Sequence, residues 1–175
     1  MSQIIAAVRR DEDMEYALKS GISIIFLLKT DINELGNTVD KVHGAGKKLF
    51  VHMDFAEGVG KDAAGCLYLK KLGVDGIITT RANIVKTARD QGISTVQRVF
   101  IVDSQSVETA VDNIKKCVPS MIELMPGIAT KAISFFKERV SVPIIAGGLI
   151  STRAEVQEAI SAGADFVSTG DISLW

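Results

Sequence analysis

Short apolar runs alternate with amphipathic segments along the whole sequence, and no other feature constrains the fold as strongly. Eight of these runs are four to eight residues long and rich in β-branched residues. Runs that are apolar on both faces are typical of parallel β-strands covered on both sides. We therefore expect strands at residues 3–8, 23–28, 48–54, 76–79, 95–102, 121–125, 143–147 and 166–169.

The segments between these runs have the periodicity and the end signals of helices. We expect helices at residues 11–20, 32–45, 62–72, 82–91, 104–116, 128–139 and 152–162. Side chains suited to cap a helix N-terminus are Asp31, Asp62, Ser104, Thr130 and either Ser151 or Thr152. Five glycines stand at the expected helix ends, where a residue in the left-handed conformation would terminate each helix: Gly21, Gly46, Gly73, Gly92 and Gly163.

Strict alternation of strand and helix requires parallel strands joined by right-handed crossovers, and eight such units favour a closed α/β barrel, the (β/α)8 TIM barrel. The 175 residues are few for this fold, which typically takes about 250. Connections should therefore be short and the eighth helix minimal. The alternative is an open doubly wound sheet, but no GxGxxG follows the first strand. No linker divides the chain, so we expect residues 1–175 to form a single domain.

Composition narrows the classes of partner. The formal net charge is −1, so no global basic field draws the protein to nucleic acid or to an anionic membrane. Cys66 and Cys117 lie far apart with no further ligand at metal-binding spacing, which argues against a zinc site and a disulfide scaffold. No signal peptide and no run of about twenty apolar residues is present. We expect a cytoplasmic protein with no membrane contact and no metal.

In a barrel the ligand site lies at the carboxyl ends of the strands, so the residues that end each strand are the candidates. The seventh expected strand ends in Gly147 and Gly148, and the eighth ends in Ser168, Thr169 and Gly170. Glycine leaves backbone N–H groups open to an anion, and these two loops are the recurrent phosphate site of barrels. We expect these residues to bind a phosphate group, unless the glycines serve only tight turns.

The third expected strand carries ionisable side chains toward its end. A period of two places Phe50, His52 and Asp54 on one face, and Glu57 follows in a polar, glycine-rich segment. Ionisable groups on a buried face are costly unless that face opens into a site. We expect Asp54 and Glu57 to bond to ligand hydroxyls, and the alternative is that they hold a hard cation. The alternative for His52 is a hydrogen-bonded core histidine.

Glu123 lies within an otherwise apolar strand and needs a partner, for which Arg98 on the preceding strand is the candidate. This pair could be purely structural. The amide of Gly127, in the turn that follows Glu123, could face a ligand. Further candidates at the ends of the fourth and fifth strands are Thr79, Thr80, Arg81 and Asp103.

Three lysine doublets stand at or just after helix ends, before a strand: Lys47 and Lys48, Lys70 and Lys71, Lys115 and Lys116. In a barrel these junctions lie on the amino-terminal face, opposite the ligand. The cations could simply complement helix carboxyl ends. The functional alternative is a ring of lysines that contacts RNA.

Several segments match one known family in order along the chain. They are residues 50–54, 57–58, 75–80, 97–100, 103–104, 123–127, 143–150, 168–170 and 174–175. With these motifs the sequence resembles, over essentially its whole length, the glycerol-3-phosphate-responsive antiterminators of bacterial glycerol uptake operons.

The resemblance implies a regulator that binds glycerol 3-phosphate and acts on leader mRNA of glycerol-utilisation operons to prevent premature transcription termination. It implies no resident cofactor and no catalytic residue, and it leaves a homo-oligomer open. The ligand positions that carry over are His52, Asp54, Glu57, Glu123, Gly147, Gly148, Ser168 and Thr169. The family has serine and asparagine near Gly170 and Asp171, and an inward Asp171 would repel a phosphate. The alternative function is an isomerase, aldolase or phosphodiesterase acting on a small phosphorylated metabolite.

Overall fold

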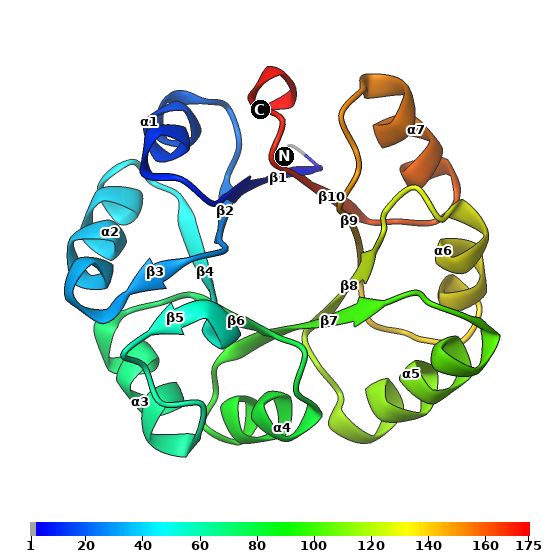
Figure 1. Cartoon of the computed structure of the whole chain (residues 1–175), viewed down its shortest axis with the longest axis horizontal. Coiled ribbons are helices and arrows are strands. Elements are labelled where there is room, and N and C mark those ends of the chain that lie inside the picture. Colours follow the sequence, from blue (N-terminus) through cyan, green and yellow to red (C-terminus); the bar gives the residue numbers. More distant parts are fainter. Residues whose placement is uncertain (1–2) are drawn as a thin grey trace.

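A computed structural model describes residues 3–175 and shows a closed barrel of eight parallel strands ringed by helices (Figure 1). The strands are β1 (Ile4–Val8), β2 (Ile24–Leu27), β4 (Lys48–His52), β6 (Gly76–Thr79), β7 (Ser94–Phe100), β8 (Met121–Met125), β9 (Ile144–Gly147) and β10 (Phe166–Thr169). Each strand pairs with the next, and β1 pairs with both β2 and β10, which closes the barrel. The predicted (β/α)8 barrel is confirmed, and the open sheet is excluded.

The helices form the outer layer in Figure 1, between successive strands. They are α1 (Asp11–Lys19), α2 (Ile32–Gly44), α3 (Ala63–Leu72), α4 (Ala82–Asp90), α5 (Ser104–Cys117), α6 (Thr130–Lys137) and α7 (Arg153–Ser161). A single 3-10 turn, η2 (Ile172–Leu174), stands in place of the eighth helix, as the length predicts. No helix within residues 3–175 has the length and apolar character that a membrane crossing requires.

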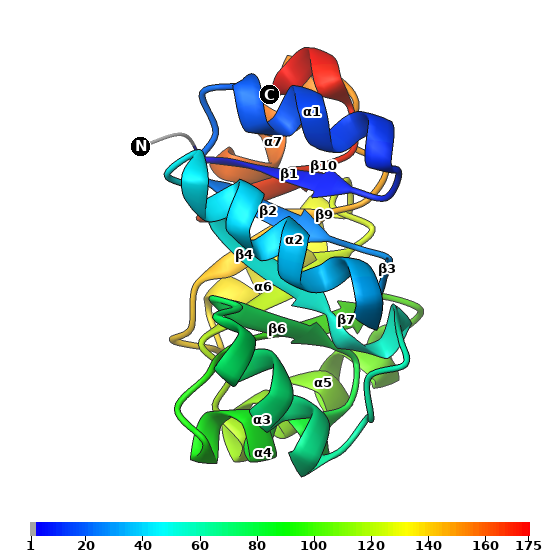
Figure 2. The same cartoon turned by 90° about the vertical axis from the view of Figure 1, so that its left-hand side faces the viewer.

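Two loops at the carboxyl ends contain structure that the sequence pattern did not predict. The 3-10 helix η1 (Met53–Phe55) follows β4 directly. The short strands β3 (Thr30–Asp31) and β5 (Ala56–Glu57) then pair in parallel outside the barrel. Figure 2 shows β3 on the side toward which the barrel strands point. The loops after β2 and β4 are thereby tied together over one edge of the barrel mouth.

The helix ends follow the predicted signals with three corrections. Asp31, Asp62 and Thr152 cap their helices through side-chain hydrogen bonds. The cap of α5 is Asp103 rather than Ser104, because the carboxylate accepts the N–H of Ser106, whose hydroxyl accepts the N–H of Asp103. The residue before α6 is Ala129, so Thr130 is already helical.

The glycine prediction holds at four of its five positions, where the backbone takes positive φ: Gly46, Gly73, Gly92 and Gly163. The third correction concerns Gly21, because α1 already ends before Ser20, whose backbone is extended.

The barrel interior is built in layers along the strands. Inward side chains from six strands fill its middle: Ile5, Phe26, Phe50, Ile78, Val96 and Ile145. Nearer the carboxyl ends of the strands, inward positions of β4, β7, β8 and β10 hold His52, Arg98, Glu123 and Ser168. The apolar layer is therefore the floor of a polar mouth.

Gly76 is required by this packing. A Cβ at Gly76 would overlap the ring of Phe50 on the neighbouring strand. We predict that Gly76→Ala lowers the free energy of unfolding by about 1–3 kcal/mol, the usual cost of overpacking a core. Gly44→Ala is the matched control, because a Cβ at Gly44 meets nothing within 4 Å. Urea denaturation should show a loss for Gly76→Ala alone; equal midpoints for the two variants would contradict this packing argument.

Candidate ligand-binding site

The centre of the mouth is a buried charge network around Glu123. Arg98 Nε donates to Glu123 Oε2 at 2.6 Å, and the two side chains are 8% and 1% exposed. Ser168 Oγ donates to Glu123 Oε1 at 2.6 Å. A Cβ at Gly147 would lie 2.5 Å from the same Oε1, so only glycine leaves room for the carboxylate. The predicted Arg98–Glu123 pair is thus confirmed, and it brings Gly147 and Ser168 together with it.

His52 lies at the end of β4 beside this network and is 1% exposed. Neither ring nitrogen has a hydrogen-bond partner within residues 3–175, so the core-histidine alternative with satisfied nitrogens does not hold. Burial and then the nearby charge of Arg98 lower the pKa of His52 from 6.5 to about 4. The imidazole is therefore neutral at physiological pH. The ring of Phe55 stacks on it at a centroid distance of 4.9 Å.

Asp54 is not on the face of β4 where period two placed it. The strand ends at His52, and Asp54 lies in η1, which turns its carboxylate toward β6. Oδ1 accepts the hydroxyl of Thr79 at 2.8 Å, and Oδ2 accepts the N–H and hydroxyl of Thr80, each at 2.9 Å. Arg81 Nε lies 3.7 Å from Oδ1. Burial alone would raise the pKa of Asp54, but the bonds from Thr80 and Thr79 hold it below its ordinary value.

A cavity of about 650 Å³ opens beside these residues, the size of a small-molecule site. Residues 54–61 form one wall, and Arg9, Leu28, Lys29 and Arg98 complete the lining. Four cationic side chains thus face two carboxylates. Glu57 lies on the cavity wall 3.6 Å from Lys29.

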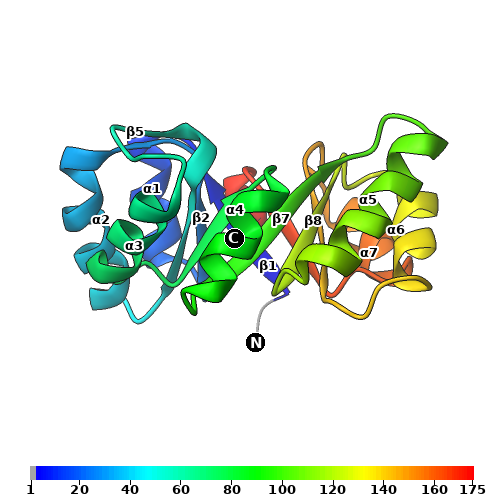
Figure 3. The same ribbon diagram turned by 90° about the horizontal axis from the view of Figure 1, so that it is seen from below.

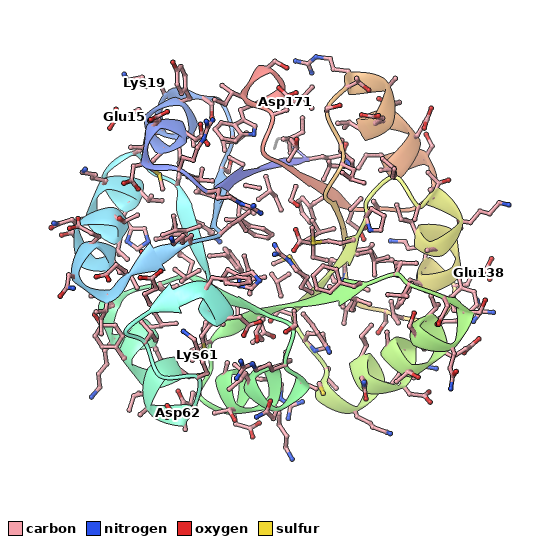
Figure 4. The ribbon with its side chains drawn as sticks, in the orientation of Figure 1. Glu15, Lys19, Lys61, Asp62, Glu138 and Asp171 are labelled. Carbon is pink, nitrogen blue, oxygen red and sulfur yellow. The ribbon has the colours of Figure 1, made fainter. Side chains whose placement is uncertain are left out.

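Lys61 donates to the carbonyls of Ala56 and Val59, and burial lowers its pKa. Figure 4 shows Lys61 nearer the barrel axis than Asp62. Sequence reasoning missed Arg9, Lys29 and Lys61 as site residues. The first two directly follow expected strands, so the rule of carboxyl ends could have found them.

The loops after β9 and β10 lie side by side. Thr169 Oγ1 donates to the carbonyl of Ile150 at 2.6 Å and accepts the N–H of Asp171, so this hydroxyl joins the two loops. Gly148 and Leu149 both have positive φ, and the amides of Leu149 and Gly170 have no acceptor within residues 3–175. These loops do not line the 650 Å³ cavity, which lies nearer β1, β2, β4 and β7.

The hydrogen bonds near these loops answer two points that the sequence left open. The Gly127 amide does not face a ligand, because it donates to the carbonyls of Gly147 and Gly148 at 2.6 and 3.0 Å. Asp171 does not act as an inward charge, since its carboxylate accepts the N–H and hydroxyl of Ser173 and caps η2. Figure 4 shows Asp171 by the C-terminal segment.

The lysine doublets lie at the amino-terminal ends of the strands, as predicted. Lys47 is buried, and its ammonium donates to the carbonyls of Ser20 and Ile22 at 2.8 and 2.5 Å. It is therefore removed from the expected RNA surface. Lys70 donates to the carbonyl of Gln91 at the end of α4, so it complements a helix carboxyl end, which is the alternative to RNA contact. The other members are exposed: Lys48, Lys71, Lys115 and Lys116.

The oxygens of Asp54 are already engaged by threonine donors, which leaves the hard-cation alternative without support. Within the described residues no cluster of three or more His, Cys, Asp or Glu side chains is arranged to hold a metal. Cys66 and Cys117 are both buried free thiols.

The unpartnered nitrogens of His52 should make stability depend on pH. Because the folded-state pKa is lowered to about 4, the unfolded chain binds a proton between pH 6.5 and 4 that the folded chain does not. The free energy of unfolding should therefore fall as pH drops through this window, by at most about 1.4 kcal/mol per unit. His52→Leu should flatten this part of the profile in urea denaturation at several pH values. A wild-type profile that is flat from pH 6.5 to 4, or unchanged in the variant, would contradict it.

The sequence and the fold are both similar to those of known proteins. The family model for the glycerol-3-phosphate responsive antiterminator matches residues 4–175. The crystal structure of a glycerol uptake operon antiterminator regulatory protein from Listeria monocytogenes superposes with a TM-score of 0.93 at 34% identity, covering 98% of this chain and 94% of that one. A glycerol uptake operon antiterminator-related protein from Thermotoga maritima gives 0.89 at 32% identity, covering 99% and 98%.

A relative known by sequence is the uncharacterized protein YgcP of Escherichia coli, 34% identical over 173 residues, which are 98% of this chain and 91% of YgcP. The family match spans nearly all of the chain, and the polar mouth lies on its matched strands. This protein therefore belongs to the glycerol-3-phosphate responsive antiterminator family.

Proposed function

We propose that this protein senses glycerol 3-phosphate in the barrel mouth and, in the bound state, acts on leader mRNA of glycerol-utilisation operons to prevent premature transcription termination. The observation that best supports ligand binding is the burial of His52 without hydrogen-bond partners within residues 3–175. A buried side chain with two unpartnered nitrogens costs stability, and a hydroxyl-bearing ligand would supply the missing hydrogen bonds. The family description and the Listeria relative support the choice of ligand and the regulatory role.

The phosphate group is assigned to the loops after β9 and β10. Gly147, Gly148 and Gly170 give the backbone close approach, and the amides of Leu149 and Gly170 are free to donate to an anion. Ser168 would contact the ligand, whereas Thr169 would act by holding the two loops together. The four cations that line the cavity favour a dianion at the mouth through their field.

The polyol is assigned to the other side of the mouth. His52, Glu123 and the wall that carries Asp54 and Glu57 present an imidazole and carboxylates that suit hydroxyl groups. The ring of Phe55 stacks on His52 and also lines the cavity, so contact with the imidazole requires this ring to move aside. Phe55 is largely exposed, so little packing opposes that movement.

The same contacts favour binding over catalysis. A general base at neutral pH needs a pKa near 7 and a free lone pair. His52 has a pKa of about 4, Asp54 accepts three hydrogen bonds, and Glu123 is held by Arg98 and Ser168. An isomerase, aldolase or phosphodiesterase mechanism would have to start from a weakly basic imidazole or from carboxylates that are already hydrogen-bonded.

Calorimetry with glycerol 3-phosphate, glycerol and inorganic phosphate tests the ligand. We predict that glycerol 3-phosphate binds more tightly than either part, and that His52→Leu weakens this binding about tenfold by removing hydrogen bonds. His43→Leu is the matched control, because His43 is the other histidine and lies near Asp75 on the amino-terminal face. Equal affinity for phosphate alone, or an equal loss in both variants, would refute the assignment.

The gating step has a separate test. A ligand shifts a conformational equilibrium only if it binds one state more tightly. We therefore predict that saturating glycerol 3-phosphate raises the affinity for a terminator-bearing leader RNA in fluorescence anisotropy. If calorimetry shows ligand binding while the RNA affinity stays unchanged at low salt, the gating mechanism is wrong.

A further inference from the structure

We propose that the groove between the carboxyl end of β7 and helix α5 binds one unpaired nucleobase of the leader RNA. This inference rests on the proposed function, because it locates the RNA contact of the same regulator. Figure 3 shows β7 between α4 and α5. The groove is lined by the end of β7 and by α5, at the rim of the barrel. It is therefore distinct from the lysines of the amino-terminal face.

The groove has a volume of about 490 Å³, and its lining is about equally polar and apolar. Its walls include the amide side chains of Gln97, Gln105 and Asn113, and the aromatic ring of Phe100 lies at its edge, 54% exposed. Sequence-specific RNA recognition uses this combination: an unstacked base lies on an aromatic ring while amides bond to its edge.

Gln97 is the strongest indication that a ligand belongs here. Its side chain is 5% exposed, and its Oε1 has no hydrogen-bond donor in the described part of the chain. Leaving a buried amide oxygen unpaired costs stability, so its presence calls for an occupant. An amide offers one acceptor and two donors, which is the pattern that reads the edge of a base.

The amides of Gln105 and Asn113 are also available. Neither side chain makes a hydrogen bond to residues 3–175. Both lie on α5, whose N-terminus is fixed by the Asp103–Ser106 capping box. The three amides therefore stand on two rigid elements, which suits a pocket that selects by hydrogen bonding.

The groove is connected through its lining residues to the 650 Å³ cavity of the ligand-binding site. Arg98 lines both of them. Thr80 lines the groove and donates its N–H and hydroxyl to Asp54, which lines the cavity. A ligand that draws Arg98 or Asp54 toward the cavity also acts on the groove wall. This contact path gives the effector a physical route to RNA affinity.

The test starts from RNA selected by the wild-type protein from a library of hairpins with randomised loops, at saturating glycerol 3-phosphate. Anisotropy with the selected RNA then compares Phe100→Ala and Gln97→Met with the wild type. We expect each variant to raise the Kd for RNA about tenfold, the scale of one lost base contact. Calorimetry should show that the affinity for glycerol 3-phosphate is unchanged.

Matched controls separate the groove from general surface effects. Tyr16→Ala removes an aromatic ring of similar exposure (58%) on α1, and Gln157→Met replaces an exposed amide on α7. Both should bind the selected RNA like the wild type. Thermal unfolding adds a second readout: Gln97→Met removes an unpaired buried polar atom, so it should keep or raise the Tm while it loses RNA affinity. A purely structural glutamine would lower the Tm instead.

The outcomes distinguish this inference from the proposed function. If Phe100→Ala binds the selected RNA as tightly as the wild type while a Lys115→Ala, Lys116→Ala variant loses it, the groove is wrong and RNA regulation stands. If Phe100→Ala loses glycerol 3-phosphate as well, the groove belongs to the effector site and the inference is overturned. If the wild type enriches no RNA although it binds glycerol 3-phosphate, both the groove and the RNA-directed function fail.

Discussion

The burial of the Glu123 carboxylate is the constraint on which the mouth of the barrel depends. A carboxylate removed from water is tolerated only when it is paired and hydrogen-bonded, and breaking such a pair typically costs about 3–5 kcal/mol. Arg98 on β7 supplies the charge, Ser168 on β10 supplies a hydroxyl, and Gly147 on β9 supplies the space. One side chain on β8 thus fixes the identity of residues on three other strands.

Around this hydrogen-bonded network, the mouth and its rim hold buried polar groups that find no partner in the part of the chain that the structure describes. Within residues 3–175, the nitrogens of His52 on β4 and the side-chain oxygen of Gln97 on β7 have no hydrogen-bond partner. Groups of this kind lower stability, and a bound molecule that completes their hydrogen bonds would offset that cost. Arg98 lines both the cavity and the groove, and its charge lowers the pKa of His52, so it is the residue through which the two proposed sites would affect each other.

The opposite face of the barrel uses its charges for structure. The carboxylate of Asp75 accepts the N–H of Leu49 and contacts His43, and that of Asp165 accepts the N–H of Ile144 and bonds to Lys137. Each aspartate stands just before one strand and anchors the start of its neighbour. Together with the buried Lys47, these contacts explain why charge on the amino-terminal face need not indicate a partner.

The sequence by itself determined the barrel, because alternating strands and helices are local patterns that admit few topologies. It also gave the Arg98–Glu123 pair, since parallel neighbouring strands bring equivalent positions together. Only the tertiary structure decided which other groups each candidate side chain contacts. Asp54 bonds to Thr79 and Thr80 because a 3-10 turn stands where the sequence predicted the end of a strand. Lys47 is buried, and its ammonium bonds to a carbonyl in the loop after α1. Such pairings depend on how loops return across the barrel, and no local pattern encodes that path.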